Sequence, residues 1–292
     1  MSNMQLDIKK TVTLTGHNGP IYTIGKGLAA SSVFTGSSDK YVALWNLETL
    51  HAEKFAAALP AAVYCLCYIP EKNLLLTGTT EGKIHLLDLD KKEEIKILQH
   101  HTAPVFDINY SLKNNCFYTT GGDGCLAVCS LETLSLIQLK KLCSDKVRSI
   151  DFNTSTKELA VASGDCMIRI FDLDTLQQKQ AIQGHRLSAN VVKYSPDGSI
   201  LLTGGRDAHL NIWTTSDYSL VKSIPAHNYA IYDIQFNPDA TLIATASRDK
   251  TIKLWDARTF DFLVRISKEN FEGHTNSVNK LLWSSYNNYL VS

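Results

Sequence analysis

The stretch TASRDKTIKLWD, residues 245–256, alternates apolar and polar residues but also carries a threonine, an aspartate and a tryptophan at set places. A histidine, His227, lies 22 residues before Asp249. A hydroxyl, an imidazole and a carboxylate are the parts of a catalytic triad. They are also the parts of a buried hydrogen-bond chain that only holds a fold together. The rest of the sequence decides between these two interpretations.

The same turn recurs six times at a constant spacing. Equivalent stretches begin at residues 35, 77, 119, 161, 203 and 245, with no insertion or deletion between them. A fixed period of about 40 residues is typical of repeat architectures. The acidic residue of the turn, each 42 after the last, is Asp39, Glu81, Asp123, Asp165, Asp207 and Asp249.

Two other positions repeat together with the turn. The residues 22 before each acid are His17, Leu59, His101, Cys143, His185 and His227. The residues six after each acid are Trp45, Leu87, Cys129, Phe171, Trp213 and Trp255. A seventh histidine, His274, follows His227 by 47 residues, so five extra residues lie in or near SKENF. Seven units are therefore begun, at about residues 7–48, 49–90, 91–132, 133–174, 175–216, 217–261 and 262–292.

Inside each unit the apolar pattern has the period of strands. Residues 230–266 show short alternating runs separated by NPDA, SRDK and ARTFD, which are typical turn sequences. Four strands are expected in each unit. No segment sustains apolar residues at the spacing of a helix, so an all-β fold is expected.

Composition and charge exclude several classes of function. The chain has 29 basic and 29 acidic residues and no basic stripe, so we expect no nucleic-acid partner. The N-terminal sequence lacks the pattern of a signal or transit peptide, and no apolar run is long enough to span a membrane. Seven cysteines without a secretory signal favour a reducing compartment. We expect no membrane partner, and a cytoplasmic location.

The repeated GH, the turn acid and the WD-like end of each unit resemble the WD-repeat family of β-propellers. The resemblance covers the chain and implies one propeller over residues 1–292, with seven blades of four antiparallel strands. In that family the outer strand of the last blade comes from the N-terminus. Residues 7–15, DIKKTVTLT, resemble this closing strand.

The seventh unit ends early. Ser292 lies 18 residues after His274, the interval that separates Thr245 from His227, so the turn acid of the unit is not reached. Either the last blade lacks its third strand, or the segment is part of a longer protein. The second alternative is favoured, because a missing strand would leave backbone groups unmatched beside the closing strand.

The resemblance implies that the polar set is a structural network. In the family's geometry, aspartate accepts from histidine, histidine from the hydroxyl, and the hydroxyl from the indole N–H. Three units hold the full set, and a catalyst rarely needs three triads. The third unit lacks the indole, and the seventh offers only its histidine. The expected network residues are His17, Thr35, Asp39 and Trp45; His101, Thr119 and Asp123; His185, Thr203, Asp207 and Trp213; His227, Thr245, Asp249 and Trp255; and His274.

Signatures of enzymes and metal sites are missing from the sequence. It contains no GxSxG elbow, no complete phosphate-binding loop, no HExxH and no paired CxxC motif. His100 and His101 are adjacent, but His101 falls on the network position. We therefore predict no catalytic residue, no metal and no cofactor.

Partners of this family commonly bind the face that carries the histidine loops and the acidic turns, which we call the upper face. Carried over by position, the resemblance implies aromatic and polar residues from several units and cations from units four to six. An apolar or aromatic anchor of the partner would meet the aromatic residues, and a carboxylate or phosphate would meet the arginines. The candidate partner-binding residues are Tyr22, Tyr64, Phe106, Lys146, Arg148, Asn190, Arg206, Tyr232 and Arg248. A competing interpretation is that the aromatics only plug the central channel.

The expected function is a non-catalytic scaffold that binds a peptide or protein partner on the upper face. One alternative is a propeller enzyme with a metal or small molecule in its channel, for which Asp107 and Asp233 would be the marks. Another alternative is the propeller domain of a longer regulatory protein.

Overall fold

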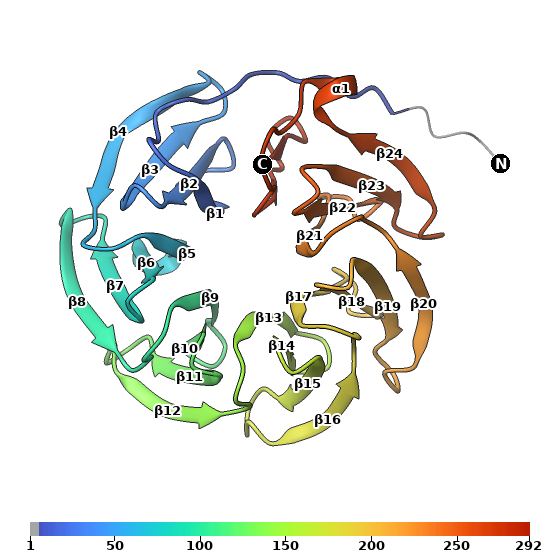
Figure 1. Ribbon diagram of the computed structural model, residues 1–292. Helices are drawn as coiled ribbons and strands as arrows, with labels where there is room; N and C mark the ends of the chain where they lie inside the picture. The colour runs from blue at the N-terminus through green and yellow to red at the C-terminus, as the bar shows by residue number, and fades with distance from the viewer. Residues whose placement is uncertain (1–5) are drawn as a thin grey trace.

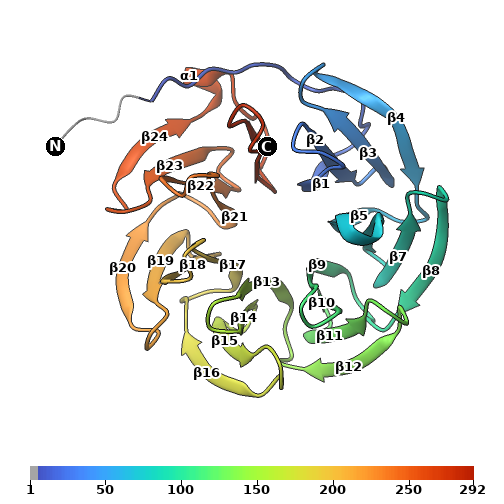
Figure 2. The ribbon, with the colours of Figure 1, turned by 180° about the vertical axis from the view of Figure 1, so that it is seen from behind.

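The computed structural model describes residues 6–292, which form a ring of β-sheets around a central channel (Figures 1 and 2). Six sheets have four antiparallel strands each, and their order in the ring is their order in the chain. Each sheet runs outward from an inner first strand to an outer fourth strand (Figure 1). The all-β propeller with four-stranded blades is therefore confirmed.

Blades one to three contain the first twelve strands. Blade one is β1 (Ile21–Lys26), β2 (Ser32–Ser37), β3 (Tyr41–Asn46) and β4 (His51–Ala58). Blade two is β5 (Val63–Ile69), β6 (Leu74–Thr79), β7 (Lys83–Asp88) and β8 (Glu93–Gln99), with the short 3-10 helix η1 (Pro70–Lys72) after β5. Blade three is β9 (Val105–Ser111), β10 (Cys116–Gly121), β11 (Cys125–Ser130) and β12 (Leu136–Lys141).

Blades four to six contain the next twelve strands. Blade four is β13 (Val147–Asn153), β14 (Glu158–Ser163), β15 (Met167–Asp172) and β16 (Gln178–Gln183). Blade five is β17 (Ala189–Tyr194), β18 (Ile200–Gly205), β19 (His209–Thr214) and β20 (Leu220–Pro225). Blade six is β21 (Ile231–Phe236), β22 (Leu242–Ser247), β23 (Ile252–Asp256) and β24 (Phe262–Ile266).

The hydrophobic core lies between neighbouring blades, because a single four-stranded sheet cannot bury both of its faces. Val191 and Leu202 of blade five, for example, form one buried cluster with Ile231 and Ile243 of blade six. Burial of one such side chain stabilises the fold by about 1.5–3 kcal/mol. Each blade therefore depends on its neighbours for stability.

The turn after the second strand places its acid by a fixed backbone geometry. The residue after each acid has a left-handed backbone, from Lys40 (φ 73°) in blade one to Lys250 (φ 72°) in blade six. In the five blades whose turn acid is an aspartate, the carboxylate then accepts the backbone N–H two residues further on, as Asp39 does from Tyr41 at 3.0 Å. This arrangement is an Asx turn, and it aims the acid toward the preceding histidine loop.

The expected seventh four-stranded blade is not formed, so the prediction of seven blades is corrected to six. The first residues of the expected unit, Phe262–Ile266, instead form β24 of blade six, and residues 267–292 supply only two strands, β25 (Leu282–Trp283) and β26 (Leu290–Val291), as a two-stranded sheet. Leu282 pairs with Val291 and Trp283 with Leu290, which is the register of blade six shifted by 47 residues. In that register the residues before Leu281 would pair with positions beyond 292, so the expected inner strand is short.

The prediction of a closing strand at residues 7–15 is also wrong, because none of these residues is in a strand. An outer strand needs a third strand to pair with, and the described part of unit seven has none. The segment instead runs along the rim from blade six to blade one (Figure 1). Leu6 and Ile8 pack against the blade six cluster, and Leu14 packs against the cluster around Trp45.

One short helix interrupts the β-structure. The extra residues before His274 include α1 (Lys268–Phe271), although no helix was expected in this all-β fold. Ser267 and Asn270 form a capping box that favours this single helical turn. Among residues 6–292, no helix has the length and apolar character needed to cross a membrane.

Candidate functional site: the upper face of the ring

The polar set forms the same hydrogen-bond chain in blades one, five and six. In blade six, His227 Nδ1 lies 2.9 Å from Asp249, and His227 Nε2 lies 2.8 Å from Thr245 Oγ1. The Trp255 indole donates to the same Thr245 oxygen at 3.0 Å. The chains in blades one and five have matching distances of 2.7–3.0 Å.

The donors of this chain have one consistent assignment. The indole N–H donates to the threonine, the threonine hydroxyl donates to the histidine, and the histidine Nδ1–H donates to the carboxylate. The backbone N–H after the histidine also donates to the acid, as Arg186 does to Asp207 at 2.8 Å. Burial opposes the charge of Asp207, but these bonds and the nearby His185 hold its pKa at about 2. The carboxylates therefore stay ionised at neutral pH.

Blade three completes the chain with a residue that sequence reasoning passed over. Cys129 stands where the indole would be, and His100 Nε2 lies 3.0 Å from Thr119 Oγ1 in its place. His101 bonds to Thr119 at 2.8 Å and to Asp123 at 3.1 Å. Burial and the adjacent His101 lower the pKa of His100 to about 4. His100 is therefore neutral at pH 7 and can donate as the indole does; its adjacency to His101 was the only signal in the sequence.

Blades two and four contain no such chain. In blade four, Arg169 donates to both Asp165 and Ser163, so a cation takes the histidine's place beside the acid. In blade two, Glu81 is exposed and pairs only with Lys83. In unit seven, His274 Nε2 lies 2.7 Å from Ser292 Oγ, the hydroxyl position of that unit.

The acids near the channel are occupied by the backbone of neighbouring units. Asp107 accepts from the backbone N–H of Ile150 at 2.9 Å, and Asp233 accepts from that of Leu281 at 2.9 Å. Lys280 Nζ lies 3.3 Å from Asp233. No cluster of three or more metal-ligating side chains occurs within residues 6–292. These two acids therefore serve as links between blades.

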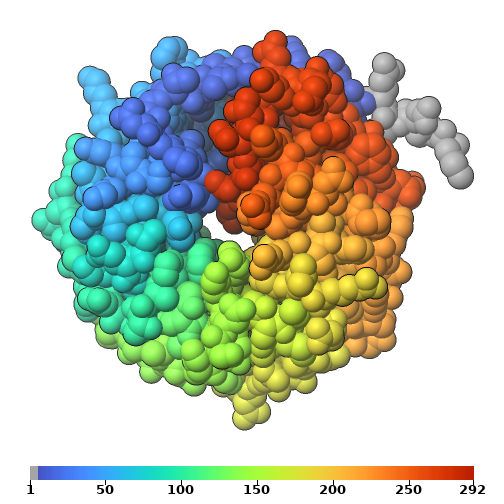
Figure 3. All heavy atoms as spheres, viewed as in Figure 1, coloured from blue at the N-terminus to red at the C-terminus, as the bar shows by residue number. Residues whose placement is uncertain are grey.

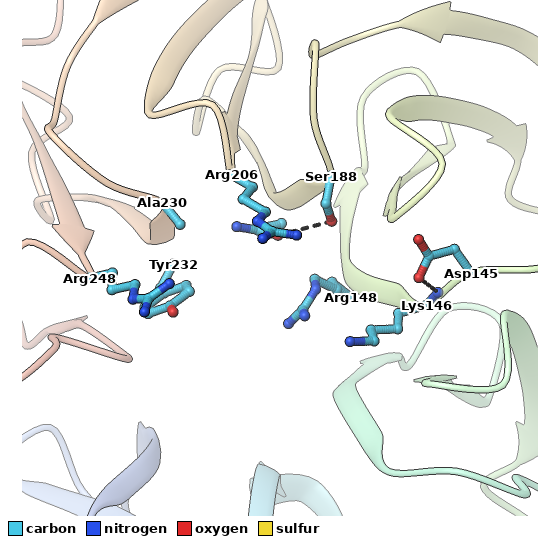
Figure 4. Close-up of a pocket in the computed structure, with 9 residues that line it drawn as sticks. Asp145, Lys146, Arg148, Ser188, Arg206, Ala230, Tyr232 and Arg248 are labelled. Carbon is cyan, nitrogen blue, oxygen red and sulfur yellow. Dashed lines mark hydrogen bonds between the residues drawn. The ribbon is translucent and has the colours of Figure 1, made fainter.

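A pocket of about 180 Å³ opens on the upper face over blades four to six (Figure 4). Four cationic side chains extend toward a common opening from three segments, one in each of blades four to six (Figure 4). Asp145 lies on the far side of Lys146 from this opening and accepts the Lys146 backbone N–H at 2.7 Å. The lining residues are Asp145, Lys146, Arg148, Ser188, Asn190, Arg206, Ala230, Tyr232 and Arg248.

The aromatic candidates form a ladder beside this pocket. Tyr22 meets Tyr64 edge-on with ring centroids 4.7 Å apart, and Tyr64 stacks on Phe106 at 5.8 Å. The guanidinium of Arg148 lies over the Phe106 ring at 4.9 Å. The ladder therefore joins the aromatic half of the channel mouth to the cationic half. The space-filling view shows that the channel is open at its centre (Figure 3).

Comparison with family models identifies this architecture. The model for the WD domain, G-beta repeat, matches residues 8–46, 92–130, 137–172, 176–214, 218–256 and 265–292. The chain belongs to the WD40 repeat family. A search of curated proteins found no match. The family model passes over the second unit, where Leu59 and Leu87 replace the histidine and the tryptophan, although this WD40 unit folds as a complete blade.

Two exposed apolar residues of the WD40 upper face were missed from the sequence. Leu187 and Tyr229 stand two residues after a network histidine and are 48% and 59% exposed. Each directly precedes a residue that lines the pocket. The binding positions implied by the family resemblance do not include the position two residues after the histidine. An exposed apolar residue in a loop also gives no distinctive pattern in a single sequence.

One candidate binding residue of the WD40 upper face is largely enclosed. Asn190 is 8% exposed, and its Nδ2 donates to the backbone oxygen of Ile231 at 3.0 Å. Asn279 makes the equivalent bond from unit seven to the backbone oxygen of Ile21 at 2.8 Å. Both amides link neighbouring units, so Asn190 has little surface left for a partner.

Proposed function

We propose that this WD40 propeller is a non-catalytic protein-interaction scaffold whose upper face binds an acidic segment of a partner protein. WD40 propellers are typical interaction scaffolds and are generally non-enzymatic. The observation that carries the proposal is the convergence of Lys146, Arg148, Arg206 and Arg248 on one pocket. None of these four cations forms an ion pair within residues 6–292, where every ion pair of a lysine or arginine involves a different lysine or arginine.

Unpaired arginines beside aromatic rings suit protein recognition. Arginine and tyrosine are enriched among the residues that dominate binding energy at interfaces. A guanidinium can donate two parallel hydrogen bonds to one carboxylate, which fixes orientation as well as charge. An acidic partner segment would therefore be held at the cationic half of the mouth, with apolar contacts beside it.

The hydrogen-bond networks favour support over catalysis. The hydroxyls of Thr203 and Thr245 belong to fully buried residues, and each hydroxyl already contacts a histidine and an indole. A nucleophile must reach a substrate carbonyl and be activated by a free base. Neither condition is met, so we assign these residues a structural role.

The test is a capture experiment with matched charge reversals. Arg206→Glu with Arg248→Glu reverses two cations of the pocket. Lys113→Glu with Arg258→Glu makes the same change of charge in exposed turns outside the upper-face loops. Proteins captured from cell extract by the intact chain should be lost with the first pair and kept with the second.

Both variants must first melt at the same temperature as the intact chain. If both variants still capture the partner, the binding site does not lie on the upper face. A partner that both lose equally would mean that overall charge, and not this pocket, controls binding.

A further inference from the structure

The pocket presents three guanidiniums from three successive blades, and their number and spacing bear on its ligand. Arg148 belongs to β13, while Arg206 and Arg248 stand just before the turn acids of blades five and six. With Lys146, four cations face one carboxylate, Asp145, which is bonded to the backbone. A single carboxylate ligand would leave most of this charge uncompensated.

Arg148 is held in place before any ligand arrives. Its guanidinium is stacked on Phe106, and its Nε is buried without a hydrogen-bond partner among the described residues. A buried donor without an acceptor costs stability unless a ligand supplies one. Such a donor is therefore a preformed place for an anionic oxygen.

We propose that this pocket takes the phosphoryl group of a phosphorylated side chain in the partner segment. The inference rests on the proposed function, because the phosphoryl group is part of the bound protein. A phosphomonoester carries a charge of about −1.5 to −2 at pH 7 and three acceptor oxygens. Three guanidiniums that approach from three blades match this group better than they match a carboxylate.

The rim of the pocket indicates which residues flank the phosphorylated one. Leu187 and Tyr229 are exposed next to the pocket-lining residues Ser188 and Ala230. The Arg248 guanidinium lies 5.9 Å from the centre of the Tyr229 ring, so the apolar and cationic surfaces adjoin. The partner segment should therefore carry an apolar residue close to its phosphorylated residue.

The experiment measures binding of fluorescent degenerate peptide pools by anisotropy. Three pools have the same residues at every position except the central one. The first pool carries phosphoserine or phosphothreonine there, the second carries glutamate, and the third carries serine. Inorganic phosphate alone is titrated as a competitor. The phosphorylated pool should bind, the glutamate pool should bind at least about tenfold more weakly, and phosphate should compete only at much higher concentration.

Variants locate the binding. Arg206→Gln and Arg248→Gln should each weaken binding of the phosphorylated pool by about tenfold to a hundredfold, as for loss of a charged hydrogen bond. Arg186→Gln is the matched control, because Arg186 is exposed on the same face but does not line the pocket. Arg148→Lys keeps the charge but removes the planar fork, and should also weaken binding.

Three outcomes would overturn the proposal. Equal binding of the glutamate pool would mean that a carboxylate suffices, which leaves the scaffold function intact. Competition by inorganic phosphate at the concentration of the peptides would indicate a small-anion site. Absence of peptide binding, or peptide binding that Arg206→Gln and Arg248→Gln leave unchanged, would contradict a phosphoryl site in this pocket. The capture experiment decides the scaffold function separately.

Discussion

At the scale of residues, the turn acids differ sharply in what depends on them. Asp249 accepts hydrogen bonds from His227, from Thr251 and from the backbone of Asn228. Glu81 stands at the equivalent position of blade two but lies at the surface with Lys83. The same repeat position therefore carries a buried network in one blade and a solvated ion pair in another.

We expect Asp249→Ala to destabilise the protein far more than Glu81→Ala. Removal of Asp249 leaves buried donors without acceptors, at a cost of about 1–3 kcal/mol for each. Loss of an exposed ion pair costs about 0–1 kcal/mol. Thermal melting of the two variants checks this difference, and equal shifts in Tm would contradict the network.

At the scale of elements, the seventh unit has the weakest backbone pairing. β25 and β26 share two residue pairs, whereas β22 and β23 share five. Side chains compensate in part. Ser284 donates to the backbone oxygen of Ala30 at 2.6 Å, and Lys280 pairs with Asp233 of blade six. Apolar side chains join the ring here as well, because Leu281 lies in the blade six cluster and Leu282 packs against the cluster around Trp45.

We expect amide hydrogen exchange to be fastest in residues 6–15 and 277–292. Regions with few buried contacts and few paired amides open at low free-energy cost. Hydrogen-exchange mass spectrometry of the whole chain measures this, with β13–β16 of blade four as the slow reference. Protection of residues 277–292 equal to that of blade four would contradict the expectation.

At the scale of the whole molecule, repeated networks couple stability to pH. Unfolded histidine has a pKa of about 6.5, and burial, with the adjacent His101, lowers that of His100 to about 4. Burial also lowers the pKa values of His101 and His227. Between pH 6.5 and 4 the unfolded chain therefore binds more protons than the folded one.

We expect the free energy of unfolding to fall as the pH drops from 6.5 toward 4, and to fall further between about pH 4 and 2. The second decrease arises because the folded pKa of Asp207, about 2, lies below its ordinary value of 3.8. Urea unfolding at several pH values measures both decreases. Stability that stays constant from pH 7 to pH 4 would contradict the neutral, buried histidines.

His100→Leu should flatten the first part of this pH dependence. It should also lower stability at pH 7 by about 1 kcal/mol, because the Thr119 hydroxyl loses the N–H that donates to it. His51→Leu is the control, since His51 is exposed on β4. The expected cytoplasmic location stays a prediction.

The sequence by itself determined the repeat, the blade architecture and the positions of the hydrogen-bond networks. These depend on local alternation and on residues at a constant spacing, which one chain displays directly. Only the tertiary structure decided that six blades and not seven are complete, because a β-strand forms only where a neighbouring strand pairs with its backbone. Only the structure placed His100 in the role of the indole and gathered Arg148, Arg206 and Arg248 at one pocket. Such groupings arise from side chains of different blades, and their distances are set by the closure of the ring.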